Sequence, residues 1–473
     1  MMRSLFSGVA GLKTHQTKMD VIGNNIANVN TVAYKSQSVT FQELMYQTTQ
    51  SASGANEETG RAGVNAKQIG LGVTTGAINA AITTAGASQT TGNPFDIQIK
   101  GDSFFIVSDG SNNFFTRAGA FYVDGAGNLA MTSNGYTVMG WQEDPTNEGT
   151  IKKDTVSALK IMSPENMTSE PEQTTKSYLE GVIDKNSKQL STTDGVIVNI
   201  SVYDSLGYSY IAKFGIKPSA SGTEGEYDIS PLDLIDSNGF SLMHKSDEAG
   251  YEKTGYDKAN PPYASPATMQ LDGASSATLV YNTTTGKNLN RIDPTKPDSE
   301  EVPFKLTIGG VVANTFTEPI DVNVGTTTMY DNKGTSTIKG TAGNYDGYYA
   351  GRKVGEMSGV AIGTDGKITA TYDNGTTKLL GQIAVANFPN PSGLEKVGEN
   401  LYQSTMNSGA FDGIGADVSS GSGSMSTGVL EMSNVDLSAE FTDMITTQRG
   451  FQANSRIITV SDSMLEELTN LKR

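Results

Sequence analysis

Residues 5–26 read LFSGVAGLKTHQTKMDVIGNNI, and the spacing of their side chains predicts one long amphipathic helix. Seven positions recur at alternating steps of four and three, namely Leu5, Val9, Leu12, Gln16, Met19, Gly23 and Ile26. A stripe that repeats every 3.5 residues requires a partner helix along its whole length. Residues 1–30 contain no proline, so we expect a single helix of about 26 residues there.

The other end of the chain carries the same pattern. The stripe continues every three or four residues and shifts by one position near its middle: Leu437, Phe441, Met444, Gln448, Phe451, then Ile457, Ser461, Met464, Leu468 and Leu471. Asp436 and Glu440 near the start of this stretch suit the positive end of a helix dipole. The sequence therefore predicts a second long helix that begins near residues 434–436.

Two hypotheses explain the stripes: they pack on each other, or they pack on neighbouring copies of the chain. A lone helix pair leaves part of its apolar surface in water, and exposed patches of that kind usually mark interfaces. Polar positions such as Gln16 and Gln448 weaken an isolated pair and can set the register among several helices. We therefore favour assembly, with a helical subunit interface predicted at Leu5, Val9, Leu12, Gln16, Met19, Ile26, Leu437, Phe441, Met444, Gln448, Phe451, Ile458, Met464 and Leu468.

Composition narrows the class of protein. The 473 residues suggest about two to four domains. A net charge of −17 disfavours nucleic-acid binding. No apolar run reaches the roughly 18 residues of a membrane-spanning helix, and the N-terminus lacks the pattern of a cleavable signal peptide, so we expect neither membrane insertion nor a cleaved leader. The chain has no cysteine, which excludes disulfides and thiol chemistry.

Between the two ends the sequence is mainly of β type. Alternation at 95–100 and short apolar runs separated by Gly-containing turns indicate a β-sandwich or barrel. Strands are also expected at 196–203 and 210–216, and Asp373-Asn374-Gly375 predicts a hairpin. Proline-rich residues 217–300 suggest irregular structure or a small subdomain. We predict a multidomain fold with nested, mainly β domains: a terminal helical coiled coil from 1–30 with 435–473, an extended connector at 31–75, a discontinuous β domain from 76–160 with 371–434, and one or more inserted outer β domains at 161–370.

A search for catalytic chemistry finds no constellation. The only histidines, His15 and His244, have no metal-pair spacing, and His15 is most simply a helix-surface or interface residue. The segment 124–128 lacks the acidic ligands of a calcium loop and indicates a hairpin turn. The segment 331–334 also indicates a turn and not a calcium loop. No dinucleotide, phosphate-binding or nucleophile-elbow motif is present. We therefore expect no enzyme activity, no catalytic residues, no cofactor and no metal.

Three blocks of sequence resemble the bacterial flagellar rod and hook family. The first combines LFSGVAGL at 5–12 with MDVIGNNIANVNT at 19–31 and ends in Tyr34-Lys35. The second includes TGNPFD at 91–96 and TRAG at 116–119, and the third includes SNVDL at 433–437 and FQANSR at 451–456. The family-motif residues are Asn24, Asn25, Asn28, Thr31, Tyr34, Lys35, Arg449, Gln452 and Asn454. The long central insertion resembles the hook branch of the family more than the shorter rod branch.

This resemblance implies a subunit that polymerises helically into the flexible, curved tube of the flagellar hook, which transmits torque. It implies an extracellular location in the hook, type III export without a cleavable signal peptide, and contacts with itself, the distal rod protein, the hook cap protein, the hook–filament junction protein and the export apparatus. Three residues depart from the family pattern. Ala33 and Ser103 stand where glycine is usual, and Gly450 where alanine is usual. A glycine at 33 with positive φ would make alanine require a different local turn.

Other functions stay open at this stage. A distal rod protein with a long insertion would form a straight, rigid polymer. A secreted adhesin or glycan-binding β protein would act as a monomer and would not need its terminal helices. A glycosidase using unrecognised carboxylates would require a cleft, and no sequence feature supports one.

Overall fold

A computed structural model describes residues 2–54, 60, 62–144, 146–147, 149–243, 267–289, 303–310, 316–421 and 423–471. The chain forms two compact units. Unit 1 comprises Met1–Asn166, Gly359–Ala370 and Thr377–Arg473, and unit 2 comprises Met167–Ser358 and Thr371–Thr376. His244, much of the proline-rich stretch and the last two residues lie outside the described residues. The finer four-part division expected from the sequence stays a prediction.

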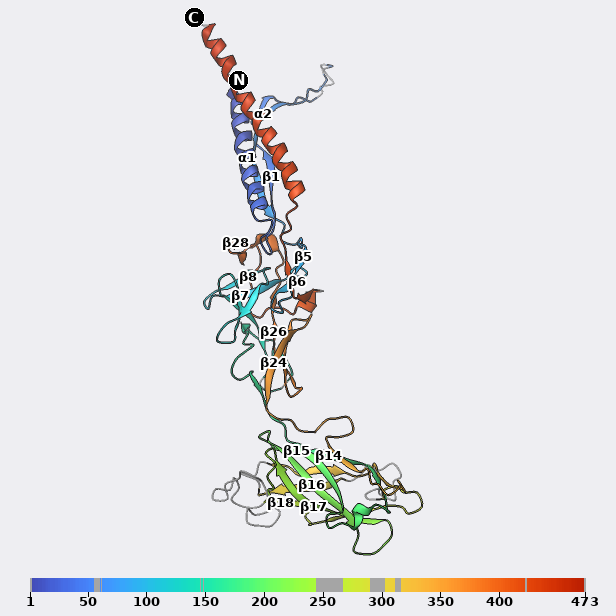
Figure 1. Ribbon diagram of the computed structural model, residues 1–473. Helices are drawn as coiled ribbons and strands as arrows, with labels where there is room; N and C mark the ends of the chain where they lie inside the picture. The colour runs from blue at the N-terminus through green and yellow to red at the C-terminus, as the bar shows by residue number, and fades with distance from the viewer. Residues whose placement is uncertain are drawn as a thin grey trace. The chain divides into compact units, whose positions relative to one another are not determined.

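The two long helices of unit 1 are the two ends of the chain. Helix α1 is Met2–Ala27 and α2 is Leu437–Asn470, and they lie side by side with both termini at the same end of the pair (Figure 1). Asp436 caps α2, because its carboxylate accepts hydrogen bonds from the backbone N–H groups of Ser438 and Ala439. The predicted terminal helices are confirmed. Neither of them, nor any other helix of the described residues, is long and apolar enough to cross a membrane.

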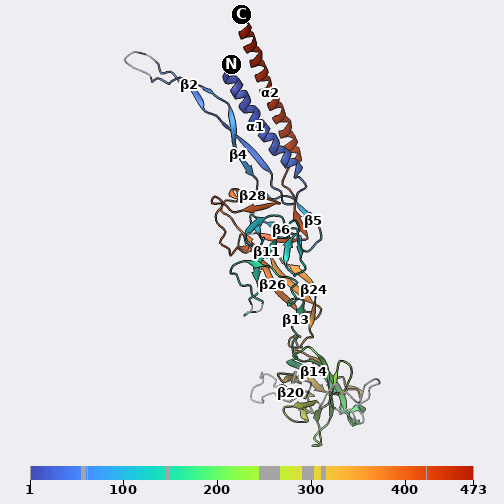
Figure 2. The same cartoon turned by 90° about the vertical axis from the view of Figure 1, so that its left-hand side faces the viewer.

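The segment expected as a connector forms an antiparallel ribbon. Strand β1 (Gln37–Glu43) pairs with β4 (Val73–Ala80), and β2 (Tyr46–Gln50) pairs with β3 (Lys67–Gly70). Helix α1 packs against β1 and β4, as Figure 2 shows for β4. All residues of β2 and β3 are exposed. The weak periodicity of this segment therefore reflects strands that lack a buried face within the chain.

The β portion of unit 1 is one main sheet with short accessory strands. Its strands are β5 (Ser88–Thr90), β6 (Ile97–Lys100), β7 (Phe104–Ser108), β8 (Asn113–Thr116), β9 (Phe121–Val123), β10 (Leu129–Met131), β11 (Thr137–Gln142), β12 (Ser157–Ala158), β25 (Lys367–Tyr372), β26 (Thr377–Ile383), β27 (Val385–Ala386), β28 (Glu395–Gly398), β29 (Leu401–Gln403), β30 (Ser424–Thr427) and β31 (Val429–Glu431). The strands of unit 1 in this sheet run in the order β25-β26-β11-β7-β8-β29-β28, while β30–β6 and β31–β5 pair separately. Short 3-10 turns occur at Pro391–Gly393 and Val418–Gly421.

Aromatic residues fill the core of this sheet. The Phe388 ring lies 4.7 Å from that of Phe115 and 6.0 Å from that of Phe104, in edge-to-face geometry. Trp141 is buried beside them, and its indole N–H lies 3.0 Å from the carbonyl oxygens of both Asp154 and Ile414. The single tryptophan is therefore a core residue of this unit.

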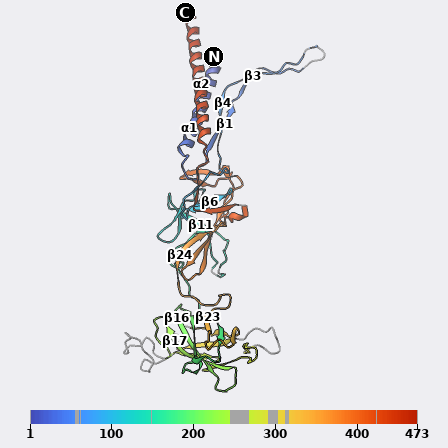
Figure 3. The same ribbon diagram turned by 45° about the vertical axis from the view of Figure 1, so that its right-hand side comes forward.

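Unit 2 is a two-sheet β-sandwich. Its strands are β13 (Thr168–Ser169), β14 (Lys176–Ile183), β15 (Val196–Tyr203), β16 (Ser209–Pro218), β17 (Glu226–Asp236), β18 (Thr268–Leu271), β19 (Ala277–Val280), β20 (Phe304–Gly309), β21 (Ile320–Asn323), β22 (Thr327–Met329) and β23 (Lys339–Ala342), with a 3-10 turn at Lys188–Ser191, and β24 (Gly355–Ile362) contains residues of both units. One sheet runs β18-β20-β21-β14-β22, with β23 paired to β14, and the other runs β15-β16-β17-β19. Figure 3 labels β23 of the first sheet and β16 and β17 of the second. One core cluster takes residues from both sheets, so their inner faces pack together.

Several predicted strands are confirmed, and of the two alternatives for the proline-rich stretch, irregular structure throughout is not what the described residues show. Strand β15 has the predicted bounds, β16 contains the predicted 210–216, and Gly375 N–H donates to Tyr372 O in the predicted hairpin turn. The proline-rich stretch is not irregular throughout, because β17 passes through Pro231 as an eleven-residue strand. Its pairing with β16 shifts register at this point. A bulge is where a sheet tolerates proline, so the proline did not end the strand.

Candidate functional site: the terminal helices and their junction

Small and polar residues make the contact between α1 and α2. A Cβ added to Gly11 would lie 2.7 Å from Asn454 Nδ2, and one added to Gly8 would lie 3.2 Å from Ile458 Cγ1. The helices therefore approach closely because these glycines have no side chain. Hydrogen bonds join the ends of the contact, from Ser4 to Ser461 (3.3 Å) and from Asn25 Nδ2 to Glu440 Oε1 (2.8 Å). The order of these pairs makes the helices antiparallel.

The residues of α1 that contact α2, which we call its contact line, each lie one position before a residue of the heptad pattern predicted from the sequence. Its members repeat at steps of four and three: Ser4, Gly8, Gly11, His15, Lys18, Ile22 and Asn25. The hypothesis that the two stripes pack on each other is therefore wrong for most of their length. The heptad period was therefore predicted correctly, but the contact was expected at the larger side chains. The two backbones approach so closely that smaller residues form the contact instead.

The predicted interface residues are mostly open to solvent in a single chain. Val9 is 54% exposed, Phe441 50% and Leu468 48%. The exposed members are Val9, Gln16, Leu437, Phe441, Gln448, Phe451, Met464 and Leu468, and the half-buried ones are Leu5, Leu12, Met19, Ile26, Met444 and Ile458. A subunit interface at these residues stays a prediction. We call the exposed apolar members the apolar stripe, together with Ile445, Ile457 and Val460, which are also exposed.

Gly450 provides space for His15. A Cβ at position 450 would lie 2.8 Å from His15 Cε1. On its other side the imidazole meets Phe41 of β1 edge to face, with ring centres 5.5 Å apart. The glycine at 450, where the family usually has alanine, therefore leaves room for the bulky His15. It lowers the helix propensity of α2 but lets α1, α2 and β1 meet at His15. Burial and the nearby Lys18 ammonium lower the pKa of His15.

Beside the helix pair, a buried ion network joins segments that are distant in the chain. Glu431 Oε1 accepts from Lys35 Nζ at 2.7 Å, and its Oε2 lies 3.3 Å from Arg117 Nε. All three side chains are about 1% exposed. The Arg117 guanidinium also donates to the carbonyls of Gly101 and Ser103. We call Lys35, Arg117 and Glu431 the buried triad. Its charges are paired and hydrogen-bonded, the condition under which burial is tolerated.

The sequence analysis named Lys35 as a family-motif residue but missed Arg117 and Glu431 as functional partners. The available signal was their setting: Glu431 is the single charge of Val429-Leu430-Glu431-Met432, and Arg117 follows the strand Phe114–Thr116. An isolated charge within an apolar strand predicts a buried partner. Sequence spacing does not identify that partner, because Lys35 and Glu431 are 396 positions apart.

Amide side chains extend the junction toward the helices. Asn25 Oδ1 accepts from the Tyr34 hydroxyl and from the Gln37 backbone N–H. Asn24 Nδ2 donates to the same hydroxyl, at 3.2 Å. Asn434 Nδ2 donates to the carbonyl of Ala81. These amides join the end of α1 to Tyr34 and to β1, and the segment before the α2 cap to the residue after β4.

The other family-motif residues divide into two groups. Asn28 accepts from Thr31 Oγ1 at 3.1 Å and so belongs to the turn after α1. Asn454 Nδ2 donates to Gly450 O on its own helix while its side chain meets Gly11. Arg449 and Gln452 are exposed on α2, away from the junction.

Ala33 has a left-handed backbone with φ of 57°, the conformation expected of the glycine it replaces. The expectation that alanine would need a different turn is therefore wrong. The backbone N–H of Ala33 donates to Glu431 O at 2.8 Å, and its side chain is buried. The junction thus holds a non-glycine residue where left-handed φ costs about 1–2 kcal/mol. Ser103 is also buried, and its backbone carbonyl accepts a hydrogen bond from the Arg117 guanidinium.

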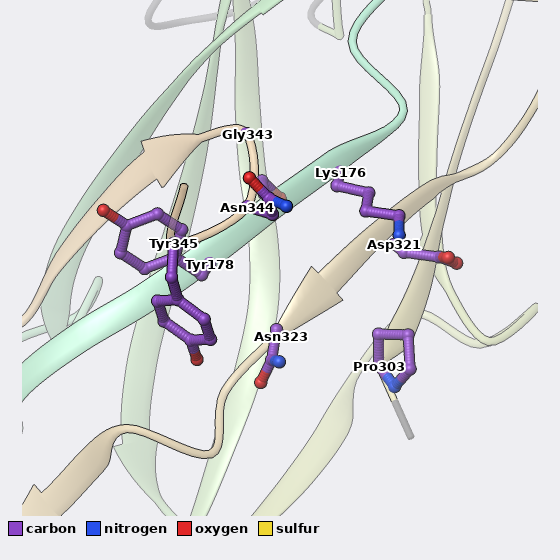
Figure 4. A pocket seen from close by; sticks show the side chains of 9 residues that line it. Lys176, Tyr178, Pro303, Asp321, Asn323, Gly343, Asn344 and Tyr345 are labelled. Atoms are coloured by element: carbon purple, nitrogen blue, oxygen red, sulfur yellow. The ribbon is translucent and has the colours of Figure 1, made fainter. Parts of the chain in front are cut away.

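Unit 2 contains a hollow of about 540 Å³. Figure 4 shows Tyr178 and Tyr345 side by side at one end and Lys176 near Asp321 at the other. The two tyrosine ring centres are 4.7 Å apart. The described residues that line the hollow include no histidine and no pair of carboxylates. Within the described part of the chain, no group of three His, Cys, Asp or Glu residues could hold a metal ion.

The turn expected at 124–128 is present. Asp124 Oδ1 accepts from the backbone N–H groups of Ala126 and Asn128, and its Oδ2 accepts from Asn128 Nδ2. Both carboxylate oxygens are therefore engaged within the turn, and these hydrogen bonds lower the pKa of Asp124. The prediction of a hairpin turn is confirmed.

Three family models match separate parts of the chain. "Flagella basal body rod protein" matches residues 5–35, "Flagellar hook protein FlgE/F/G D1 domain" matches 98–170, and "Flagellar basal body rod FlgEFG protein C-terminal" matches 426–471. The matched segments contain, respectively, α1 with Lys35, the strand before Arg117, and α2 with Glu431. Each member of the buried triad thus comes from a different matched segment.

Full-length relatives agree with these models. The chain is 35% identical to the flagellar hook protein FlgE of Treponema pallidum (strain Nichols) and 36% identical to that of Borreliella burgdorferi, with all of each chain covered. It is 28% identical to the flagellar basal-body rod protein FlgG of Bacillus subtilis, again over the whole of both chains. Among solved structures, the flagellar hook protein FlgE2 of Helicobacter pylori matches at 14% identity with a TM-score of 0.39, covering 73% of this chain and 100% of that one.

Proposed function

Because the chain belongs to the flagellar hook protein family and is a structural subunit of the bacterial flagellar hook, we propose that it polymerises helically through its terminal helices into a flexible, curved tube that transmits torque. The relatives' names describe a hook component, and the absence of enzyme activity stays an expectation.

The apolar stripe is the observation that carries this proposal. Ile445 is 54% exposed, Val460 57% and Phe451 40%, all on α2. Single exposed apolar residues are ordinary, but a continuous row along a 34-residue helix is a patch that normally contacts a partner. Because α1 already occupies the contact line of α2, the partner is a neighbouring copy.

The β1–β4 ribbon supports the same conclusion. Met45 is 79% exposed, Tyr46 51% and Ile69 45%. A two-stranded ribbon with apolar residues in water is marginal by itself. Packing against other copies would cover these residues, so we infer that the ribbon also contributes to the polymer.

Bending and cohesion are assigned to different parts of the chain. The apolar stripe supplies tight contacts that hold the tube together. Unit 2 completes its own core within one chain, and we infer that its contacts with neighbouring copies are hydrated and can slide as the tube bends. Helical growth requires a heterologous interface that does not close into a ring, and the long terminal helices supply one.

The remaining assignments follow from family membership. We propose that the chain is exported by the flagellar type III apparatus without a cleavable signal peptide and resides in the extracellular hook. Its proposed partners are further copies of itself, the distal rod protein, the hook cap protein and the hook–filament junction protein.

Electron microscopy of the polymerised full-length chain tests this function. We expect hollow tubes that are curved and supple. Straight, rigid tubes would instead support a rod function, for which the full-length similarity to a rod protein is the relevant observation. A folded chain that stays monomeric under all polymerising conditions would contradict both.

A further inference from the structure

A small surface pocket lies next to the buried triad in unit 1. It has a volume of about 170 Å³, and its lining includes Asn28, Tyr34, Lys396, Glu399, Asn400 and Tyr402. Pockets for cofactors and other small ligands usually measure about 300–1,000 Å³. This pocket is therefore too small for such a ligand, but it can accept the end of one polar side chain.

Lys396 supplies the positive charge of the pocket. Its ammonium lies 5.0 Å from the centre of the Tyr34 ring and 3.3 Å from the backbone oxygen of Lys35. Among the described residues it has no ion-pair partner, unlike the neighbouring Lys35, which is paired with Glu431. The residue as a whole is exposed, while its ammonium is partly buried where it donates to Lys35 at the wall of the pocket. Partial desolvation lowers the pKa of Lys396, which a carboxylate at this position would reverse.

The backbone around the pocket is strained. Glu399 and Asn400 form the turn between β28 and β29 with φ of 50° and 61°, values usually adopted there by Asn-Gly. Ala33, with φ of 57°, lies next to Tyr34 in the same pocket wall. Strain of this kind persists where surrounding contacts fix it, and it concentrates at functional sites. Two hydrogen bonds fix the backbone here: Asn400 Nδ2 donates to the Val32 carbonyl, and Glu399 Oε2 accepts from Asn134 Nδ2.

We propose that this pocket receives an Asp or Glu side chain of a neighbouring copy, with Lys396 as its counter-ion. Glu399 lines the pocket, but its carboxylate is hydrogen-bonded to Asn134 and leaves Lys396 uncompensated. The chain carries 51 acidic against 34 basic residues, so any neighbouring copy presents an excess of carboxylates. The proposal rests on the polymerisation proposed above and adds a specific polar contact to the apolar stripe.

Carbodiimide coupling in an isotopically mixed polymer tests the contact. Equal amounts of ¹⁴N-labelled and ¹⁵N-labelled full-length chain are polymerised, coupled and digested, and the linked peptides are identified by mass. We expect a Lys396–carboxylate link that carries both labels and that is absent from the unpolymerised chain. The Lys353–Asp373 pair, 2.8 Å apart within unit 2, is the internal control and should give links of a single label in both samples.

Each other outcome has a definite meaning. Links from Lys396 of only one label, or no Lys396 link where the control pair couples, would overturn the inference while the polymer itself stands. A chain that forms no polymer would overturn the proposed function and this inference with it.

Substitution gives a second readout. Lys396→Met should raise the critical concentration for polymerisation by about fivefold at low salt and by less at high salt, because exposed ion pairs are screened. Lys396→Arg should restore the original value. Equal critical concentrations for Lys396→Met and the unaltered chain at low salt would contradict the proposed contact.

Discussion

The terminal helices and the unit 2 sandwich use their apolar residues in opposite ways. In β15, buried and exposed residues alternate, and Val198, Ile200 and Val202 are at most 1% exposed. In α2 the large apolar side chains face water, while Thr447 and Ser461 are the buried residues. Unit 2 therefore completes its hydrophobic core within one chain, whereas the helices leave theirs for other chains to complete.

This difference separates folding from assembly. The contact between α1 and α2 relies on glycines and hydrogen bonds, so it can form without using the apolar stripe. The stripe then remains available for neighbouring copies. Substitutions in the two regions should accordingly alter different measurements, and the expected effects below run from the largest to the smallest.

Loss of Glu431 should have the largest effect on the stability of unit 1. Glu431→Ala leaves Lys35 and Arg117 buried without their counter-ion, which costs about 3–5 kcal/mol in comparable cases. Denaturant unfolding monitored by the fluorescence of Trp141, the only tryptophan and a core residue of unit 1, measures this cost. Glu395→Ala, at an exposed site, is the matched control and should change stability by less than about 0.5 kcal/mol. Equal effects of the two substitutions would contradict the role of the triad.

Leucines in the two regions should respond differently to truncation. Leu306 is fully buried in unit 2, so Leu306→Ala should cost about 2–5 kcal/mol, measured by amide hydrogen exchange in β20 and its neighbours. Leu468, in the apolar stripe, is 48% exposed, and Leu468→Ala should alter monomer stability by only about 0.5 kcal/mol. A large loss for Leu468→Ala in the monomer would show that the stripe is part of the chain's own core.

A double-mutant cycle can test the close contact of His15 with Gly450. Gly450→Ala alone adds a Cβ 2.8 Å from the imidazole, and we expect an overpacking cost of about 1–3 kcal/mol, partly offset by the better helix propensity of alanine. In a His15→Ala background the same substitution should stabilise the chain by about 1 kcal/mol.

Gly23→Ala is the control for that cycle, because a Cβ at this position meets no atom within 4 Å. It should stabilise α1 by about 0.5–1 kcal/mol whichever residue stands at position 15. Thermal unfolding followed by the helical circular dichroism signal measures all variants. Additive effects of His15→Ala and Gly450→Ala would exclude the contact.

The smallest effect concerns pH. Burial lowers the pKa of His15 below its ordinary value of 6.5, so the unfolded chain binds a proton at a higher pH than the folded chain. The contribution of His15 to stability is complete above about pH 6.5 and is lost as pH falls through the lowered value. Between pH 7.5 and 5.5 the unaltered chain should therefore lose more helical stability than His15→Ala. Equal losses would refute this origin of the pH dependence.

The regular elements could be predicted from the sequence because their signals are local. The helix periods, the Asp436 cap and the alternation in Val196–Tyr203 each depend on residues only a few positions apart. The ribbon at 37–80 could not be predicted in this way, because its strands lack the buried face that produces alternation. Pro231 was misleading for a related reason, since it lies at a bulge of β17 that the local sequence pattern does not reveal.

The candidate site was only partly predictable. The stripe could be predicted from the spacing of large side chains. The actual helix contact depends on how closely two backbones approach, and a hydrophobic pattern does not reveal that Gly8 and Gly11 lie at this contact. The buried triad depends on pairing over hundreds of positions. The position of Lys35 in a recurrent motif showed that it matters, and only the fold showed that Glu431 and Arg117 are its partners.

The most direct test of the account compares folding and polymerisation in one variant of the apolar stripe. Phe441→Ser with Phe451→Ser should leave monomer unfolding within about 0.5 kcal/mol of the unaltered chain, because both rings are already exposed. The critical concentration for polymerisation should rise about tenfold to hundredfold, since fully burying a phenylalanine contributes about 1.5–3 kcal/mol and about half of each ring is still exposed in the monomer. Thr442→Ser with Thr459→Ser, at exposed polar positions of the same helix, should change neither quantity. Unchanged polymerisation of the phenylalanine variant would contradict the claim that the apolar stripe joins the subunits.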